Sequence, residues 1–410
     1  MSESPSYSKL LRDRPFRALW VAQVISQSGD AIFDVALLWL VLVTTGSAVL
    51  VGLTQAVVLI PPVFAKPFAG VYADRLNRRN IMIGSSLFQG GVTGVLSVLY
   101  LAGTLRFPVL LLFVLLLYTG AEFFRSANLA IVPAIVSREN LGAANGLFTL
   151  TTSANQLASY TVGGVVLATV GAAVSISYDS LTFFVAAALL TLVARSYGQT
   201  AAMGARSGRR LAADFREGVA YVRKNRLFLE LIVAGIIVNF FGTIFNAGMA
   251  PFVRNQLGGN ALDYGLVLSF YALGAIAGSL VLGKVNFRTF VGKILFAGVV
   301  CAGVLMVAAG EARNVPEGLV IVLALGALGG VINLPIQVLV QSSIPSEILG
   351  RAGTVLGSLL AASQPFGALA FGALVGVVSI GETFVASGVV VTLVALVLYF
   401  PFSELRRAKY

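Results

Sequence analysis

Histidine is absent from this chain, and cysteine occurs once, as Cys301. With a single cysteine no disulfide can form within the chain, and the redox compartment cannot be read from it. The missing histidine removes the side chain that most often exchanges protons near neutral pH. Any proton chemistry must therefore use carboxylates, tuned by lysine or arginine.

Charge is also scarce, at 11% of the residues against 58% hydrophobic ones, and the mean hydropathy is +0.92. Soluble domains carry roughly a quarter charged residues. This number of charged residues is too small to cover the surface of a soluble protein of 410 residues. The excess of apolar side chains must therefore face lipid. The 44 glycines agree with this, because glycine is frequent in membrane helices and lets their backbones approach closely.

No sequence motif indicates catalysis. The chain lacks a phosphate-binding Gly-Lys-Ser/Thr loop, a cluster of metal-ligating residues and room for a nucleotide-binding domain. We therefore expect no enzyme activity, cofactor or metal, and expect an ion gradient or the substrate gradient to supply energy. The net charge of +11 can indicate nucleic-acid binding, but the basic residues lie between apolar segments, so we expect none.

Twelve apolar segments are long enough to cross a membrane, since a spanning helix needs about 20 mostly apolar residues. They are residues 16–44, 49–73, 81–103, 107–133, 144–170, 175–197, 227–253, 262–285, 290–310, 317–341, 352–377 and 381–402. The odd-numbered loops between them hold only Arg106, Arg254 and Arg313. By the positive-inside rule, this distribution predicts a multi-pass protein of the plasma (bacterial inner) membrane with both termini in the cytoplasm.

The longest polar stretch, residues 198–226, divides the chain into residues 1–197 and residues 227–410. Its second half has amphipathic spacing and predicts a helix along the inner membrane surface. The two divisions match in places: Ala31-Ile32-Phe33-Asp34 aligns with Thr243-Ile244-Phe245-Asn246, and Gly46 then aligns with Gly258. The matches predict an all-α membrane protein of two pseudo-symmetric six-helix bundles joined by a cytoplasmic linker.

A charged motif joins the second and third segments, and its residues are Gly70, Asp74, Arg75, Arg78 and Arg79. The stretch resembles the signature loop of the major facilitator superfamily. Residues 25–30, 141–145 and 179–184 resemble its branch of enterobactin exporters, macrolide-efflux proteins and multidrug exporters. The resemblance runs from about residue 15 to residue 400. Residues 159–164 keep a glycine pair but lack the proline of many drug/proton antiporters, which weakens the antiporter assignment.

The resemblance implies the major facilitator fold and a gate at this loop. Gly70 would allow close helix packing, and Asp74 would face the start of the eleventh segment and hold the cytoplasmic side shut. Arg75, Arg78 and Arg79 would pair with acids across the interface between the halves, or would merely obey the positive-inside rule.

The first segment carries four polar side chains on one helical face: Gln23, Gln27, Asp30 and Asp34. A carboxylate at the bilayer centre costs at least about 2.5 kcal/mol, so it normally faces the bundle interior or a water-filled cavity. Burial favours the protonated form of a carboxyl group. We therefore predict Asp30, and next Asp34, as proton-coupling residues; the alternative is a structural hydrogen bond or a permanent ion pair with Lys66 or Arg125.

The fourth segment places Tyr118, Glu122 and Arg125 on one face. Glu122 would be protonated in one transport state, and Arg125 would respond to it or bind an anionic group. The alternative is a static ion pair, because residues three apart on a helix can pair with each other.

Further polar and aromatic side chains fall on the segments that build substrate sites in two-bundle carriers. The predicted substrate-binding residues are Gln27, Phe33, Tyr118, Asn239, Thr243, Asn246, Asn333, Gln337 and Gln364. Charge is thus concentrated in the first half and neutral polarity in the second.

The leading hypothesis is a monomeric secondary transporter in the lipid bilayer that exports a bulky amphipathic small molecule, drug-like or siderophore-like. Proton antiport with alternating access would drive it. The alternatives are a lipid or lysolipid translocator, a nutrient symporter, and a transporter-like sensor without turnover.

Overall fold

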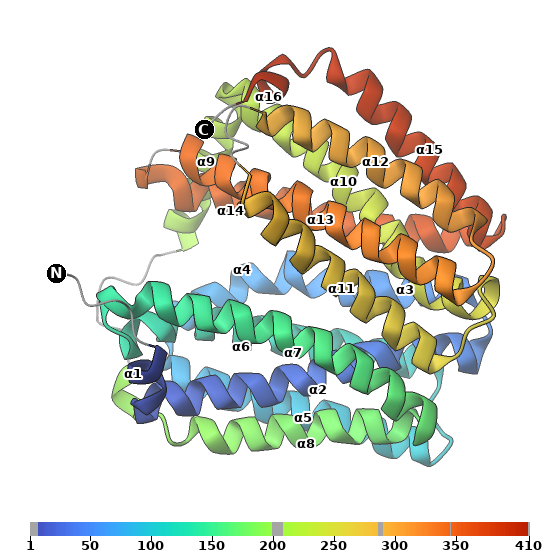
Figure 1. Ribbon diagram of the computed structural model, residues 1–410. Helices are drawn as coiled ribbons and strands as arrows, with labels where there is room; N and C mark the ends of the chain where they lie inside the picture. Colours follow the sequence, from blue (N-terminus) through green and yellow to red (C-terminus); the bar gives the residue numbers. More distant parts are fainter. Residues whose placement is uncertain (1–6, 199–207, 286–289, 345, 409–410) are drawn as a thin grey trace. The chain divides into compact units, whose positions relative to one another are not determined.

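The computed structural model describes residues 7–198, 208–285, 290–344 and 346–408, and these ranges are helical with short connections and no strand. Figure 1 shows the helices in chain order. The elements of the first half are α1 (Tyr7–Arg12), α2 (Arg14–Thr45), α3 (Ala48–Val58), α4 (Ile60–Arg75), α5 (Arg78–Leu101), α6 (Phe107–Ile135), η1 (Arg138–Asn140), α7 (Leu141–Thr169), α8 (Ala172–Leu190) and η2 (Arg195–Gly198). Those that follow are α9 (Gly208–Lys224), α10 (Arg226–Pro251), the π-helical η3 (Phe252–Gln256), α11 (Ala261–Gly283), α12 (Val291–Glu311), α13 (Val315–Ser343), α14 (Ser346–Val375), α15 (Ile380–Tyr399) and α16 (Ser403–Arg407).

Eleven helical segments in the described ranges are long and apolar enough to cross a membrane, counting α3 with α4 as one. The 29-residue α7 lies where the fifth segment was predicted but is not among them. Its polar side chains, including Thr149, Thr152, Asn155 and Gln156, reduce its hydropathy. The predicted all-α, multi-pass membrane fold is confirmed.

The second predicted segment, residues 49–73, is not one continuous helix. It breaks at Leu59, and α4 then begins with proline in its first turn. Proline has no backbone N–H and is tolerated where a helix starts, so Pro61 and Pro62 favour a new helix here over continuation of α3. The predicted span is present as Ala48–Arg75, but the sequence analysis did not foresee the interruption at Leu59.

The chain forms two compact units. The first comprises residues 1–40 and 57–206, and the second comprises residues 41–56 and 207–410. Residues 41–56, which hold most of α3, thus group with the later helices: a Cβ added to Gly52 would lie 2.9 Å from backbone atoms of Ala368 and Gly372 in α14. The division predicted from the sequence, with a linker over residues 198–226, stays a prediction.

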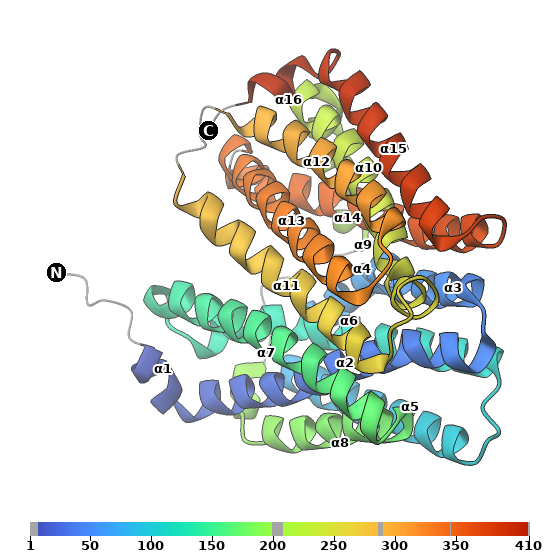
Figure 2. The ribbon, with the colours of Figure 1, turned by 45° about the vertical axis from the view of Figure 1, so that its right-hand side comes forward.

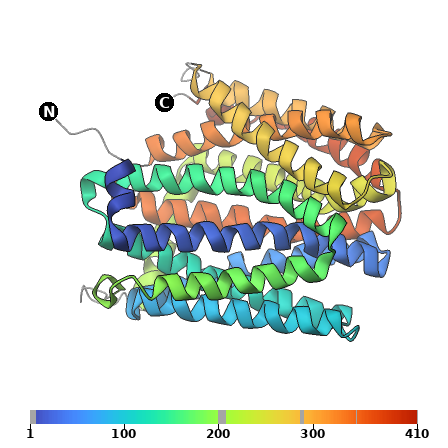
Figure 3. The same ribbon diagram turned by 60° about the horizontal axis from the view of Figure 1, so that its bottom comes forward.

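In the first unit, α8 runs alongside α2 and α5. Figure 3 shows α8 in light green next to α2 in dark blue and α5 in cyan. Toward one end of these helices, Phe16 and Leu19 of α2 pack with Met82 of α5 and Leu190 of α8 in a hydrophobic core. This packing fixes the helices whose polar side chains are described below.

In the second unit, α11 packs tightly on α13, and α12 on α15 (Figure 2). Small residues allow the close approach, because a side chain at Gly274 or Gly278 would collide with the backbone of α13 at Leu323 and Ala327. The predicted amphipathic helix is present as α9. Its Val222 is buried in the same core as Phe228 of α10.

Two turn glycines support the predicted internal repeat. Gly46 and Gly258, which the sequence alignment pairs, have φ angles of 65° and 69°, a region that glycine adopts without strain. In each case a polar side chain then caps the next helix: Ser47 accepts from the Leu50 N–H at 3.3 Å, and Asn260 accepts from the Leu262 N–H at 2.8 Å.

Candidate functional site

The first unit brings carboxyl groups from two helices together. Asp30 and Asp34 of α2 are half-buried, and the Asp34 carboxylate accepts a hydrogen bond from the Tyr118 hydroxyl of α6. Arg125 of α6 attracts both carboxylates electrostatically. The structure therefore places the two predicted proton-coupling aspartates with the predicted Tyr118 and Arg125. No group of three or more acidic or metal-ligating side chains within the described ranges could hold a metal ion.

Glu122 and Arg125 form the ion pair that their spacing predicts, with 2.6 Å between Glu122 Oε1 and Arg125 Nη1. The two ends differ in exposure, because the Glu122 side chain is 2% exposed and the Arg125 side chain 61%. The second carboxylate oxygen, Glu122 Oε2, is buried without a hydrogen-bond partner. The ion pair therefore leaves one buried carboxylate oxygen without a donor among the described residues.

Asp179 of α8 is a carboxyl group that the sequence reasoning did not select as a site residue. It is 0% exposed, and neither of its oxygens has a hydrogen-bond partner among the described residues. It lies within electrostatic reach of Asp30 and Asp34. The available signal was a carboxyl group within an apolar segment. The residues around Asp179 served only to support the family resemblance, and Asp179 itself was not predicted as a site residue.

The polar face of α2 continues toward α7. Thr152 of α7 donates to Gln27 Oε1 at 3.1 Å, while Oε1 of the buried Gln23 has no partner in the described part of the chain. Phe33, predicted to contact substrate, is 2% exposed and packed in the core. In this conformation its ring is therefore closed to a ligand.

The loop predicted to act as a gate divides into two parts. A Cβ added to Gly70 would meet no atom of the described residues within 4 Å, and the close packing that the resemblance implies at this glycine stays a prediction. Asp74 and Arg75 are exposed, and neither has a hydrogen bond or an ion pair with another described residue. The gate that the resemblance implies for Asp74 stays a prediction.

Arg78 and Arg79 are held by main-chain carbonyls within the first unit. Arg78 Nη1 donates to Ala130 O at 3.0 Å, and Arg79 Nη2 donates to Thr191 O at 2.8 Å. Thr191 directly follows the last residue of α8, where carbonyls lack helical partners and a positive charge is favourable. The predicted pairing of these two arginines with acids across the interface between the halves stays a prediction.

In the second unit, neutral amides take the place of the carboxylates. Gln364 of α14 donates to Asn239 Oδ1 of α10 at 2.8 Å, and the Thr243 hydroxyl donates to Asn239 O at 2.7 Å. The structure thus joins three of the predicted substrate residues, and the amide pair links two helices.

Three predicted residues of the second unit are more exposed. Asn246 hydrogen-bonds to Tyr271 of α11, and its Nδ2 donates to Gly242 O at 2.8 Å. Asn333 Nδ2 donates to Gly329 O of its own helix at 2.8 Å. Gln337 is exposed and has no side-chain hydrogen bond to another described residue. These amides keep unused donors or acceptors that a ligand can bind.

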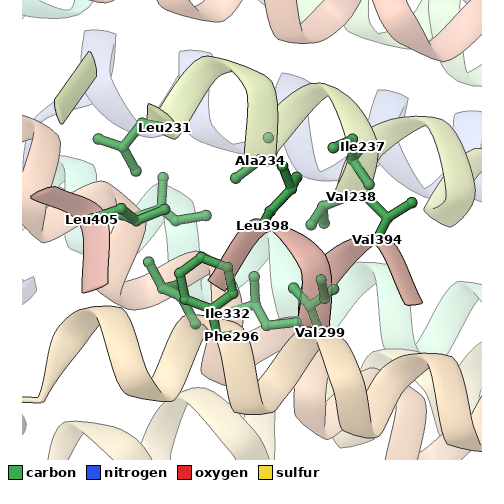
Figure 4. A pocket seen from close by; sticks show the side chains of 14 residues that line it. Leu231, Ala234, Ile237, Val238, Phe296, Val299, Ile332, Val394, Leu398 and Leu405 are labelled. Atoms are coloured by element: carbon green, nitrogen blue, oxygen red, sulfur yellow. The ribbon is translucent and has the colours of Figure 1, made fainter. Parts of the chain in front are cut away.

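A small apolar pocket of about 40 Å³ lies in the second unit, between α10, α12, α13, α15 and α16. Figure 4 shows the side chains of Phe296, Ile332 and Leu398 among those surrounding it. None of the predicted substrate residues lines it, although Gly235, one of its lining residues, accepts a hydrogen bond from Asn239 Nδ2 at 2.8 Å. The pocket can accept only an apolar group.

Comparison with known proteins places these features in a family. A family model described as transmembrane secretion effector matches residues 6–409. Macrolide efflux protein A of Streptococcus pyogenes is 24% identical over 93% of this chain and 94% of its own length. The multidrug efflux pump Tap of Mycolicibacterium fortuitum is 23% identical over 94% of this chain and 95% of its own length.

Solved structures agree on the fold. A bacterial homologue of the human lysosomal transporter Spinster superposes with a TM-score of 0.72 at 15% identity, covering 98% of each chain. The D-xylose–proton symporter superposes with a TM-score of 0.70 at 16% identity, covering 95% of this chain and 99% of its own. At these identities the similarity shows a shared fold alone.

Proposed function

The chain belongs to the transmembrane secretion effectors of the major facilitator superfamily, and from this premise we propose that it exports a bulky amphipathic small molecule, drug-like or siderophore-like, by proton antiport. The efflux direction is supported by the relatives, which include a macrolide efflux protein and a multidrug efflux pump. Proton coupling is supported by the carboxyl groups on α2 and α6, and this observation carries the proposal.

The charges of the cluster favour proton binding. Asp30, Asp34 and Glu122 share one nearby cation, Arg125, which is already paired with Glu122. Each ionised side chain at the bilayer centre costs about 2.5–3.5 kcal/mol. Binding a proton to Asp30 or Asp34 removes part of this cost, and releasing it elsewhere in the cycle supplies the coupling.

The substrate class follows from the second unit. Its predicted contact residues Asn239, Asn246, Asn333 and Gln364 offer amide donors and acceptors without fixed charge. Such groups orient a polar edge of a ligand while apolar and aromatic side chains hold its body. This combination suits an amphipathic compound better than a small, highly charged nutrient.

The direct test is transport by the purified full-length protein in liposomes, with a macrolide as probe and an imposed pH gradient. We expect accumulation to follow the gradient and to fall about tenfold or more in Asp30→Asn and in Glu122→Gln, equivalent to about 1.4 kcal/mol or more of coupling. Glu139→Gln, at an exposed glutamate next to α7, is the matched control and should leave accumulation unchanged. If both test variants accumulate the probe like the wild type, the coupling assignment is wrong.

A lipid translocator is the second candidate, because the pocket in the second unit is lined wholly by apolar side chains, as an acyl chain requires; at about 40 Å³ it is too small for such a chain in this conformation. Movement of a labelled lysolipid that persists after the pH gradient has been collapsed would favour this candidate.

The scarcity of basic residues in the odd-numbered loops supports cytoplasmic placement of both chain ends. A reporter enzyme that is active only outside the cytoplasm, fused after residue 106 and after the last residue, should be active at the first position alone.

A further inference from the structure

Asp179 is pressed against α2 at the residue next to Asp30. A Cβ added to Gly29 would lie 2.7 Å from Asp179 Oδ1 and 3.1 Å from Asp179 Cα, so only glycine fits there. One residue earlier on each helix, Ser28 Oγ and Tyr178 Oη are 3.0 Å apart and hydrogen-bonded. Two neighbouring contacts thus hold the α8 carboxyl at the α2 backbone.

The hydrogen-bond donors close to Asp179 are used elsewhere. The Thr182 hydroxyl donates to Asp179 O, the main-chain carbonyl, at 2.7 Å, and the Ser180 hydroxyl donates to Gly90 O of α5 at 2.7 Å. Both carboxyl oxygens of Asp179 are left without a partner within the described ranges, and the side chain is 0% exposed. An ionised carboxylate so placed would have neither water nor a donor, which is among the most costly states of a side chain.

The groups around Asp179 make its ionised form still less favourable. From α2 it faces the like charges of Asp30 and Asp34. From α6 it faces Tyr118, whose hydroxyl donates to Asp34. The Arg125 guanidinium pairs with Glu122 instead, and the polar side chains of the adjoining α5, Ser86, Gln89 and Thr93, are uncharged.

We propose that Asp179 is a third proton-binding carboxyl group of this cluster, buried behind Asp30 and Asp34. This inference rests on the proposed proton antiport. Asp179 holds its proton in the conformation described here, with a neutral O–H. When the cycle empties the site, the proton leaves a carboxyl oxygen of Asp179 and binds a carboxylate oxygen of Asp30, which is half-buried and nearer the solvent. Because the two groups are not hydrogen-bonded in this conformation, the transfer requires α8 or α2 to move.

The arrangement of the carboxyl oxygens distinguishes a site for a proton from a site for a metal cation. A metal ion needs several oxygens converging on one point, and no three acidic side chains of the described ranges are so arranged. A proton needs only one carboxyl oxygen. Sodium-dependent transport would therefore overturn the proposal.

The test separates exchange from driven transport. Asp179→Asn keeps the shape of the protonated acid but cannot ionise. We expect it to retain macrolide exchange at equal concentration across liposomes and to lose uphill accumulation by about tenfold or more, equivalent to about 1.4 kcal/mol. In weakly buffered solution it should also release fewer protons than the wild type on binding the macrolide. A purely structural role would lower exchange and accumulation together.

Ser86→Ala provides the matched control, since Ser86 of α5 is also 0% exposed and its hydroxyl has no partner in the described part of the chain. It should change neither exchange nor accumulation. Wild-type proton release and accumulation in Asp179→Asn would overturn the role of Asp179 alone. Absence of proton release in the wild type would overturn the proposed antiport and this inference with it.

A second measurement covers the case in which Asp179→Asn fails to fold. Hydrophobic carbodiimides add to protonated buried carboxyl groups, so mass spectrometry of the labelled wild-type protein reports the protonation of Asp179 directly. Labelling of Asp179 that decreases as the pH rises, and that the macrolide alters, supports the proposal. Labelling confined to Asp30 and Asp34 at every pH overturns it.

Discussion

The two tetrapeptides that the sequence alignment matches end differently, with aspartate in the first unit and asparagine in the second. In Ala31-Ile32-Phe33-Asp34 and Thr243-Ile244-Phe245-Asn246 the phenylalanines are 2% and 3% exposed, so both pack in the core of their own unit. The last residue of each bonds to a tyrosine, Asp34 to Tyr118 and Asn246 to Tyr271. The buried phenylalanine is thus common to both tetrapeptides, whereas only the tetrapeptide of the first unit ends in a carboxylate.

The same contrast extends to the neighbouring polar groups. The amides of Asn239 and Gln364 satisfy each other across two helices at any pH. In the first unit, Glu122 Oε2 and both oxygens of Asp179 stay without partners in the described ranges. A neutral amide pair does not change with pH, so it suits a fixed structural contact. Carboxyl groups that lack hydrogen-bond partners suit a site that binds and releases protons. This difference favours the proposed placement of proton coupling in the first unit.

Asp34→Asn makes the first tetrapeptide end like the second, and it should have the largest effect. We expect uphill accumulation to fall about tenfold or more, equivalent to 1.4 kcal/mol, because the amide cannot carry a proton. The bond from Tyr118 can persist to the amide oxygen, so the purified variant should unfold at nearly the wild-type temperature. Accumulation at the wild-type level would show that the carboxylate is dispensable.

Asn246→Asp is the reciprocal change and should act on stability. A charge at the centre of a membrane segment costs about 2.5–3.5 kcal/mol, so we expect the new carboxylate to destabilise the protein by an amount of that order. Thermal unfolding at low and high pH measures it, and the loss should be smaller at low pH, where the acid binds a proton. An equal loss at both pH values would mean that packing, not charge, is responsible.

Arg79→Ala tests whether the carbonyl contacts of Arg79 stabilise the first unit. Arg79 donates to Leu190 O at 3.2 Å and to Thr191 O at 2.8 Å, and each lost bond costs about 0.5–1.5 kcal/mol. Lys284, which directly follows α11 in the second unit, is exposed, so Lys284→Ala should change the unfolding temperature little. Equal shifts in the two variants would show that the carbonyl contacts of Arg79 contribute nothing.

Gln364→Leu breaks the amide pair and should have the smallest effect. Hydrogen bonds between membrane helices contribute about 0.6 kcal/mol on average. A double-mutant cycle with Asn239→Leu isolates the pair from the other losses. A coupling energy indistinguishable from zero would remove the amide pair from the comparison.

Local patterns predicted much of this structure. Hydropathy located the helices, the spacing of Glu122 and Arg125 predicted their ion pair, and the alignment paired Gly46 with Gly258 before their shared backbone conformation was known. Each of these depends on residues close in the chain or on a regular period.

Long-range packing set the limits of prediction. The burial of Asp179 depends on its meeting Gly29, about 150 residues away, which no helical period indicates. Likewise, Arg79 finds the carbonyls at the end of α8 only because α5 and α8 lie side by side. The break before Pro61 was visible in the sequence, but the strong hydropathy of residues 49–73 concealed it.

The proline break between α3 and α4 has a mechanical consequence. Residues 61 and 62 have no N–H to bond the carbonyls of the preceding turn, so two of the hydrogen bonds that normally stiffen a helix are absent there. The chain also passes from one compact unit to the other at residue 57, within a turn of this point. We therefore expect this membrane segment to bend more easily at the proline pair than elsewhere along its length.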